Sequence, residues 1–84
     1  MQLPLPLDIN ADVVLACIPP EKDVDALSEA PRVLAPVAGA VAEIFSRYAI
    51  DPRGKRAVVI GQGRLVGKPV ADWLTRAGAV VDVV

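Results

Sequence analysis

A glycine-rich stretch at residues 61–70, which reads GQGRLVGKPV, has the residue types and spacing best suited to bind a ligand. It follows the apolar run at residues 56–60 and precedes a helical pattern. Glycine lacks a Cβ, so the backbone can turn with a positive φ and approach a ligand closely. The first N–H groups of the following helix have no partner inside the helix and favour an anion. We therefore expect a pyrophosphate to be bound by these residues: Gly61, Gln62, Gly63, Arg64 and Val66.

The alternative interpretation of this stretch is a tight turn between a strand and a helix that binds no ligand. Lys68 could neutralise a phosphate, although a lysine in a first helical turn is more often simply solvated. Asp82 follows the loop by about 20 residues, the spacing of a ribose-binding acid in dinucleotide-binding folds. Two more residues, Val83 and Val84, follow it, so we favour a position on the face of a strand.

Composition narrows the chemistry available elsewhere in the chain. The 84 residues carry a net charge of −1, no histidine, one cysteine and three aromatic residues (one each of Phe, Trp and Tyr). A nucleic-acid partner is unsupported because no basic stripe exists. A metal site and a His-based nucleophile are close to excluded. Cys17 cannot form an internal disulfide and is expected to be a buried helix residue in a protein of the reducing cytoplasm.

The hydrophobic fraction is 54% and the mean hydropathy +0.46, which is high for a single small domain. A chain of this size buries only roughly 60–65% of its unfolded surface. No apolar run reaches the roughly 20 residues that a membrane span needs. We therefore expect part of the apolar surface to face a partner or the rest of a larger fold.

Turn signals and periodicity divide the chain into short elements. Asn10 caps a predicted helix at 11–18, whose apolar positions Val13, Val14, Cys17 and Ile18 lie on one face. Residues 21–33 are read as loop. A second helix is expected from Pro36, with an apolar stripe of Val37, Val41, Ile44, Phe45 and Tyr48. After it we expect a turn at 51–54, a strand at 55–60, a helix at 68–77 that ends at Gly78, and a strand at 79–84.

These elements predict an α/β fold, namely a partial Rossmann-type βαβ unit preceded by two helices and an extended N-terminal segment. The two strands should be parallel, because a helix connects them. In such folds the ligand lies at the carboxyl edge of the sheet, where the glycine-rich stretch begins.

Several motifs in register resemble one family. The motifs are QLPLP at 2–6, PEKDVD at 20–25, GKRAVVIG at 54–61 and VGKP at 66–69. Together they are similar to the bifunctional methylenetetrahydrofolate dehydrogenase/methenyltetrahydrofolate cyclohydrolase family, in its middle portion only. Four separate motifs in order are more specific than a glycine-rich loop alone.

The resemblance implies a domain plan and a set of site residues. Residues 1–35 would be the tail of a folate-binding catalytic domain, 36–50 a linking helix and 51–84 the start of an NAD(P)-binding domain. Gln2 would act on the reacting folate carbon, and Asp25 would bind the pterin ring through paired hydrogen bonds. The family's acid–base lysine, with a tyrosine four residues before it, would lie upstream of Met1.

The sequence departs from the family pattern in several places. Ala26-Leu27 replaces a Gly-Phe or Gly-Leu pair, and LAPVAG at 34–39 replaces Pro-Cys-Thr-Pro-x-Gly. The stretch between Asp25 and Gly39 is shorter than expected by about a dozen residues, the length of a helix of some three turns. The usual Gly-Arg-Ser reads Gly61-Gln62-Gly63, which removes two donors near the cofactor phosphates, and Arg64 could compensate two places later.

The implied reaction is hydride transfer from 5,10-methylenetetrahydrofolate to NADP⁺ or NAD⁺, followed by hydrolysis of the methenyl product. We expect a folate substrate, NADP (or NAD) as cofactor, no metal, no nucleic acid, no membrane, and a homo-oligomer. The chain by itself should be catalytically silent, because the lysine is absent. The alternative is a non-catalytic remnant or an oligomerising module that associates through an exposed sheet edge.

Overall fold

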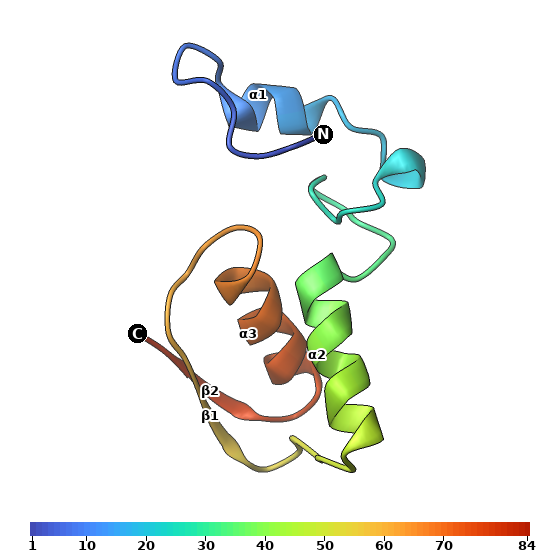
Figure 1. Cartoon of the computed structure of the whole chain (residues 1–84), viewed down its shortest axis with the longest axis vertical. Coiled ribbons are helices and arrows are strands. Elements are labelled where there is room, and N and C mark those ends of the chain that lie inside the picture. Colours follow the sequence, from blue (N-terminus) through green and yellow to red (C-terminus); the bar gives the residue numbers. More distant parts are fainter. The chain divides into compact units, whose positions relative to one another are not determined.

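The computed structural model describes residues 1–84, and the chain forms two compact units, Met1–Val33 and Leu34–Val84. Unit 1 contains α1 (Ala11–Ala16) and the 3₁₀ helix η1 (Pro20–Lys22). Unit 2 contains α2 (Pro36–Arg47), β1 (Arg56–Val59), α3 (Gly67–Arg76) and β2 (Val80–Val83), in that order (Figure 1).

Helix α1 begins where the sequence predicts it. The Asn10 side chain accepts hydrogen bonds from the N–H groups of Asp12 at 3.0 Å and Val13 at 3.3 Å, which confirms the cap. The helix ends at Ala16, two residues earlier than expected, and η1 lies in part of the segment expected to be loop.

The prediction that Cys17 is a buried helix residue is wrong. Val13 is 61% exposed, and Cys17, which was expected to be buried, is exposed. The buried residue is Leu15, which is 6% exposed and was not assigned to the apolar face of the helix. A helix shorter than two turns presents no extended stripe, so the position of one large side chain decides which side is covered.

The helices of unit 2 lie close to their predicted bounds. Pro36 occupies the first turn of α2, where its missing N–H costs nothing. Helix α3 ends before Gly78, whose φ of +94° is the left-handed conformation of a glycine terminator. Both predictions are confirmed.

Strands β1 and β2 are parallel and form a two-stranded sheet, with Ala57 opposite Val81 and Val59 opposite Val83. Helix α3 contacts both strands, and α2 contacts α3 (Figure 1). Unit 2 therefore has three layers: the sheet, then α3, then α2. The predicted α/β fold with a partial Rossmann-type βαβ unit is confirmed.

Small side chains form most of the core of unit 2. Ala38 is 1% exposed, Ala71 7% and Leu74 6%. The rings of Phe45 and Trp73 meet edge to face with centroids 5.5 Å apart, which joins α2 to α3.

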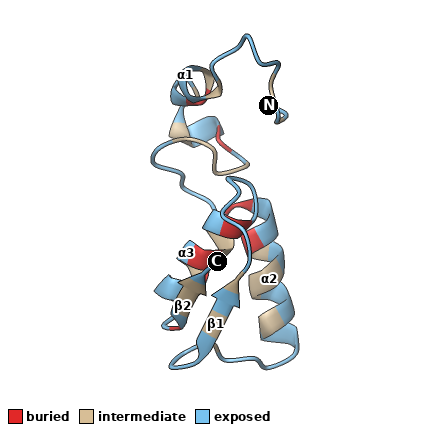
Figure 2. Cartoon of the chain, turned by 90° about the vertical axis from the view of Figure 1, so that its left-hand side faces the viewer, coloured by how far each residue is buried: buried red, intermediate tan, exposed pale blue.

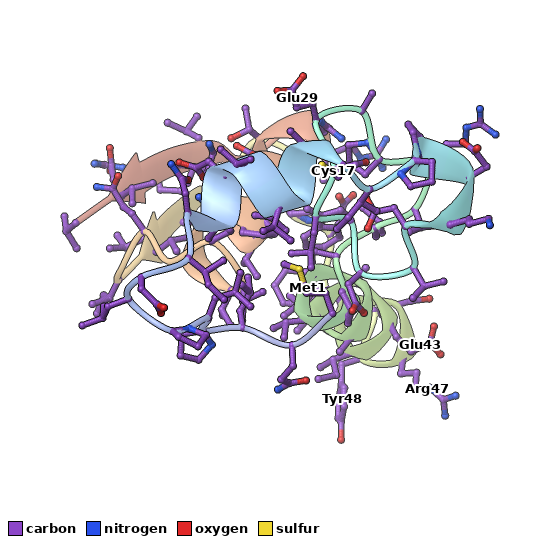
Figure 3. All side chains as sticks on the ribbon, turned by 90° about the horizontal axis from the view of Figure 1, so that it is seen from above. Met1, Cys17, Glu29, Glu43, Arg47 and Tyr48 are labelled. Atoms are coloured by element: carbon purple, nitrogen blue, oxygen red, sulfur yellow. The ribbon has the colours of Figure 1, made fainter.

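The apolar stripe predicted on α2 is only partly buried. Phe45 is half-buried, but Ile44 is 52% and Tyr48 76% exposed. Because α2 contacts α3 and neither strand, only one flank of the helix is covered. Figure 3 shows Tyr48 projecting from α2, as Glu43 and Arg47 do, and these last two form an ion pair at 2.8 Å.

The outer face of the sheet, which consists of Arg56, Val58, Val80 and Asp82, has no covering layer within unit 2 (Figure 2). Val58 is 62% and Val80 57% exposed. Arg56 Nη2 lies 2.8 Å from Asp82 Oδ2 across the two strands. Asp82 is thus a residue of the strand face, as the sequence favours.

Candidate functional site

The segment Gly61–Val66, called here the glycine loop, joins the end of β1 to the start of α3. Its residues are exposed and follow no regular secondary structure. Two hydrogen bonds fix its ends: the N–H of Gly61 donates to Val84 O at 2.8 Å, and the N–H of Lys68 donates to Gly63 O at 3.0 Å. The loop is therefore an open turn anchored at the carboxyl edge of the sheet.

Two glycines shape this turn, for different reasons. Gly61 has a φ of +96°, a conformation that side chains with a Cβ rarely adopt. Gly67, the first residue of α3, is buried against Gly61. A Cβ on Gly67 would lie 2.7 Å from the carbonyl carbon of Gly61 and closer still to its oxygen. Gly63 has neither constraint, since a Cβ there would meet nothing within 4 Å.

Gly67 is a site residue that the sequence analysis did not select. The available signal was its place as the third glycine of the segment, where close contact of helix and strand is the usual reason for glycine. The contact lets the helix begin directly above the turn.

The loop offers backbone donors to an anion. The N–H groups of Gln62 and Gly63 donate no hydrogen bond within the chain. Lys68, in the first turn of α3, is exposed and adds a positive charge, while Pro69 removes one donor from that turn. The positive end of the ten-residue helix lies at the same place. This arrangement suits a phosphate group.

The structure brings the predicted residues Gly61, Gln62, Gly63, Arg64 and Val66 together, because they form one continuous loop. Gln2 and Asp25 belong to unit 1. No hydrogen bond joins one to the other. Gln2 is exposed, one residue before the cis Leu3–Pro4 bond, and Asp25 is half-buried in the turn that follows η1.

Asp23 is a second residue that the sequence analysis missed. It is the buried charged residue of the chain, with 5% of its surface exposed. The adjacent Ser28 side chain is the main cause that lowers the pKa of the Asp23 carboxyl, and backbone N–H groups add to the effect. Ser28 Oγ is itself buried and makes no hydrogen bond of good geometry. The repeated aspartate of PEKDVD was the available signal.

A glycine turn between a parallel strand and a helix, at the carboxyl edge of the sheet, defines the opening βαβ unit of a nucleotide-binding α/β domain. Residues 35–84 match the family described as the tetrahydrofolate dehydrogenase/cyclohydrolase, NAD(P)-binding domain. The chain therefore belongs to the tetrahydrofolate dehydrogenase/cyclohydrolase family, as the motifs predict.

Curated relatives support the assignment. The chain is 40% identical over 92 residues to the bifunctional protein FolD of Lactococcus lactis, and 44% over 93 residues to that of Campylobacter concisus. Each match covers 99% of this chain and 32% of the relative. The chain thus spans about a third of the length of these relatives. Because the aligned stretches exceed the chain's 84 residues, each relative has internal residues that this chain lacks.

Solved structures agree on the fold. One is the methylenetetrahydrofolate dehydrogenase-cyclohydrolase (FolD) of Trypanosoma brucei in complex with NADP and an inhibitor. It has a TM-score of 0.88 and 37% identity, and the match covers 99% of this chain and 32% of that one. The bifunctional FolD of Campylobacter jejuni also has a TM-score of 0.88, with 38% identity over 98% of this chain and 33% of its own.

Two further observations concern the chain as a whole. None of its helices combines the length and the apolar character needed to span a membrane. No three side chains of His, Cys, Asp or Glu are grouped so that they could hold a metal ion.

Proposed function

We propose that this chain is part of an NAD(P)-dependent methylenetetrahydrofolate dehydrogenase and methenyltetrahydrofolate cyclohydrolase, and that its glycine loop binds the cofactor phosphates. The observation that carries the proposal is the contact of Gly67 with Gly61, which brings the start of α3 over an exposed turn. Residues 51–84 would open the nucleotide-binding domain, 36–50 would link it, and 1–35 would end the folate-binding domain.

In this proposal the chain binds and orients the cofactor, and bound NADP⁺ supplies the hydride acceptor. The N–H groups of Gln62 and Gly63 donate to phosphate oxygens, and Lys68 balances their charge. Such contacts are charge-assisted and strengthen as the ligand's negative charge increases. The T. brucei relative, solved with NADP, supports the choice of cofactor.

The folate would be bound by Gln2 and Asp25. A carboxylate can accept two parallel N–H donors from the aminopyrimidine edge of a pterin. The Asp25 carboxylate is suited to this because no salt bridge within the chain involves it. Gln2 would position the reacting carbon. The protein would act in the cytoplasm, where the single thiol Cys17 would stay reduced.

Titration of the ¹⁵N-labelled chain with NADP⁺ tests the cofactor site. We expect amide shifts at Gln62, Gly63 and Lys68, and weaker binding as salt concentration rises. Gly61→Ala should weaken the binding because its φ of +96° disfavours a Cβ. Gly39→Ala is the matched control: this glycine lies in α2, outside the glycine loop, and a Cβ there would meet nothing within 4 Å, so the variant should bind as the parent does. Shifts spread evenly over the surface, or no shifts in the loop, would refute the site.

The 84-residue chain by itself should not turn over substrate, since the family's acid–base lysine has no counterpart among its residues. Loss of such a group costs about 10²–10⁴-fold in rate. Reduction of NADP⁺ by the purified chain with methylenetetrahydrofolate, above the uncatalysed rate, would overturn this expectation.

The second candidate function is a non-catalytic remnant or an oligomerising module that associates through an exposed edge of the two-stranded sheet. The uncovered outer face, with Val58 and Val80 more than half exposed, favours this alternative. Sedimentation at micromolar concentration separates the two functions. A dimer that is indifferent to NADP⁺ supports the module, whereas a monomer that binds NADP⁺ supports the dehydrogenase.

A further inference from the structure

The loop that carries Asp25 is organised around one buried carboxylate. Asp23 Oδ1 accepts the N–H of Leu27 at 2.9 Å, and Asp23 Oδ2 accepts the N–H of Ser28 at 2.7 Å. Both oxygens are thus used, one for each of two successive backbone groups. The two bonds close a short loop, residues 24–26, at whose centre Asp25 lies.

The backbone of this loop reverses at Ala26, which has a φ of +56°. A left-handed conformation costs an alanine roughly 1–2 kcal/mol, so other contacts must hold it there. The bonds from Leu27 and Ser28 to Asp23 are the hydrogen bonds that span the reversal. They therefore fix the direction in which the chain leaves Asp25.

Asp23 is suited to this role by its burial as well as its charge. At 5% exposure it is shielded from water, whereas Asp25 is half-buried and remains accessible. Hydrogen bonds to an ionised acceptor are about twice as strong as those between neutral groups. One aspartate of the pair is committed to the backbone, and the other is left for a ligand.

We propose that Asp23 is a positioning residue, which holds Asp25 in the geometry that binds the aminopyrimidine edge of a folate. The inference rests on the folate-binding part of the proposed function. Asp23 does not touch the ligand in this scheme. It acts through the N–H groups of Leu27 and Ser28, which set the backbone around Asp25.

The experiment measures binding of folinic acid to the full chain by calorimetry, with p-aminobenzoylglutamate, which lacks the pterin, as second probe. The variants are Asp23→Asn, Asp25→Asn and the control Asp8→Asn, which alters an exposed acid of the same unit. We expect Asp25→Asn to abolish binding of folinic acid. Asp23→Asn should weaken it about 10- to 100-fold, the loss seen when the hydrogen-bond partner that orients a metal-binding side chain is removed.

Binding of p-aminobenzoylglutamate should be unchanged in Asp23→Asn, and this separates positioning from general damage to the fold. The amide resonances of Leu27 and Ser28 should move in the same variant. If Asp23→Asn does not fold, Asp23→Glu keeps the charge but displaces the oxygens by one methylene, and it should weaken binding of folinic acid in the same way.

Two negative results have different meanings. If the parent binds folinic acid, Asp25→Asn does not, and Asp23→Asn binds as the parent does, the positioning role is refuted while folate binding stands. If the parent itself does not bind, or Asp25→Asn binds equally well, folate recognition by Asp25 is refuted and the role of Asp23 is refuted with it.

Discussion

Replacement of Gly67 by alanine tests the geometry on which the cofactor site depends. A Cβ at this position would lie 2.7 Å from the carbonyl carbon of Gly61, well inside the contact distance of two carbon atoms. Both groups belong to the backbone, so no side-chain rotation can relieve the clash. Either α3 must move away from the turn or the glycine loop must change its conformation.

Two effects of opposite sign determine the magnitude. Overpacking of this kind costs about 1–3 kcal/mol. Alanine is favoured over glycine inside a helix by about 1 kcal/mol, which offsets part of the clash at the first residue of α3. Because the clash is with backbone atoms that cannot rotate away, the cost of overpacking lies at the upper end of this range. We therefore expect a net loss of about 2 kcal/mol in the free energy of unfolding, which lowers the folded-to-unfolded ratio about 30-fold.

Urea denaturation followed by the fluorescence of Trp73 gives the measurement. Trp73 is the single tryptophan and contacts Phe45 between the two helices, so it reports the packing of α3. Gly63→Ala is the matched control, because a Cβ there meets nothing within 4 Å. A Gly67→Ala chain as stable as the parent, with NADP⁺ affinity retained, would refute the close contact of helix and turn.

We predict the effects of three other substitutions from the backbone conformation or the charge of the residue that is replaced. Ala26→Gly should raise the free energy of unfolding by about 0.5–1 kcal/mol in thermal denaturation, because it removes a left-handed alanine at φ +56°. Gly78→Ala should lower the melting temperature by about 4–8 °C for each kcal/mol lost, since φ is +94° there. The side-chain hydrogen bonds from Arg53 lower the pKa of Asp51 to about 2, and NMR titration of Arg53→Ala should return it towards about 3.9. Because the pKa of Asp51 is lower in the folded state than in the unfolded state, the stabilisation by Asp51 is complete above about pH 3.9 and is lost as the pH falls towards 2. An unchanged titration of Asp51 in Arg53→Ala would show that Arg53 does not lower this pKa.

Local signals were sufficient to predict the elements of unit 2. Pro36, Gly78 and the apolar run before Gly61 mark starts and ends through covalent constraints that hold in any context. The observed strands, β1 and β2, each lie inside their predicted ranges but are shorter at both ends. Strand ends depend on which backbone groups find a partner, and a periodicity does not contain that information.

Burial was predicted less well, because it depends on what lies opposite each face. Tyr48 and Ile44 fit an apolar stripe, yet α2 has a neighbour on one flank only, so both remain exposed. In α1 the spacing selected Cys17, but Leu15 is the buried side chain. A repeat of 3.6 residues shows which side chains share one face of a helix, but it does not show which part of that face packs against a neighbour.

The loop positions were predictable because few residues besides glycine allow the backbone to turn sharply between a strand and a helix. The roles of Gly67 and Asp23 were not, since both arise from contacts with backbone groups that the fold brings near. The Asp23 carboxylate reaches the N–H groups of residues four and five positions ahead, and only the fold of the loop brings these groups together.

The last hydrogen bonds between the two parallel strands couple the glycine loop to the end of β2. The N–H of Gly61 donates to Val84 O at 2.8 Å, and the N–H of Val84 donates to Val59 O at 3.0 Å. The N–H of Gly61 thus belongs to the segment that follows β1 in the chain, and it is hydrogen-bonded to Val84, which follows β2. An anion that stiffens the turn would also slow fraying at the tip of β2. Deuterium uptake at the amides of Gly61 and Val84 would then report ligand occupancy without any probe attached to the protein.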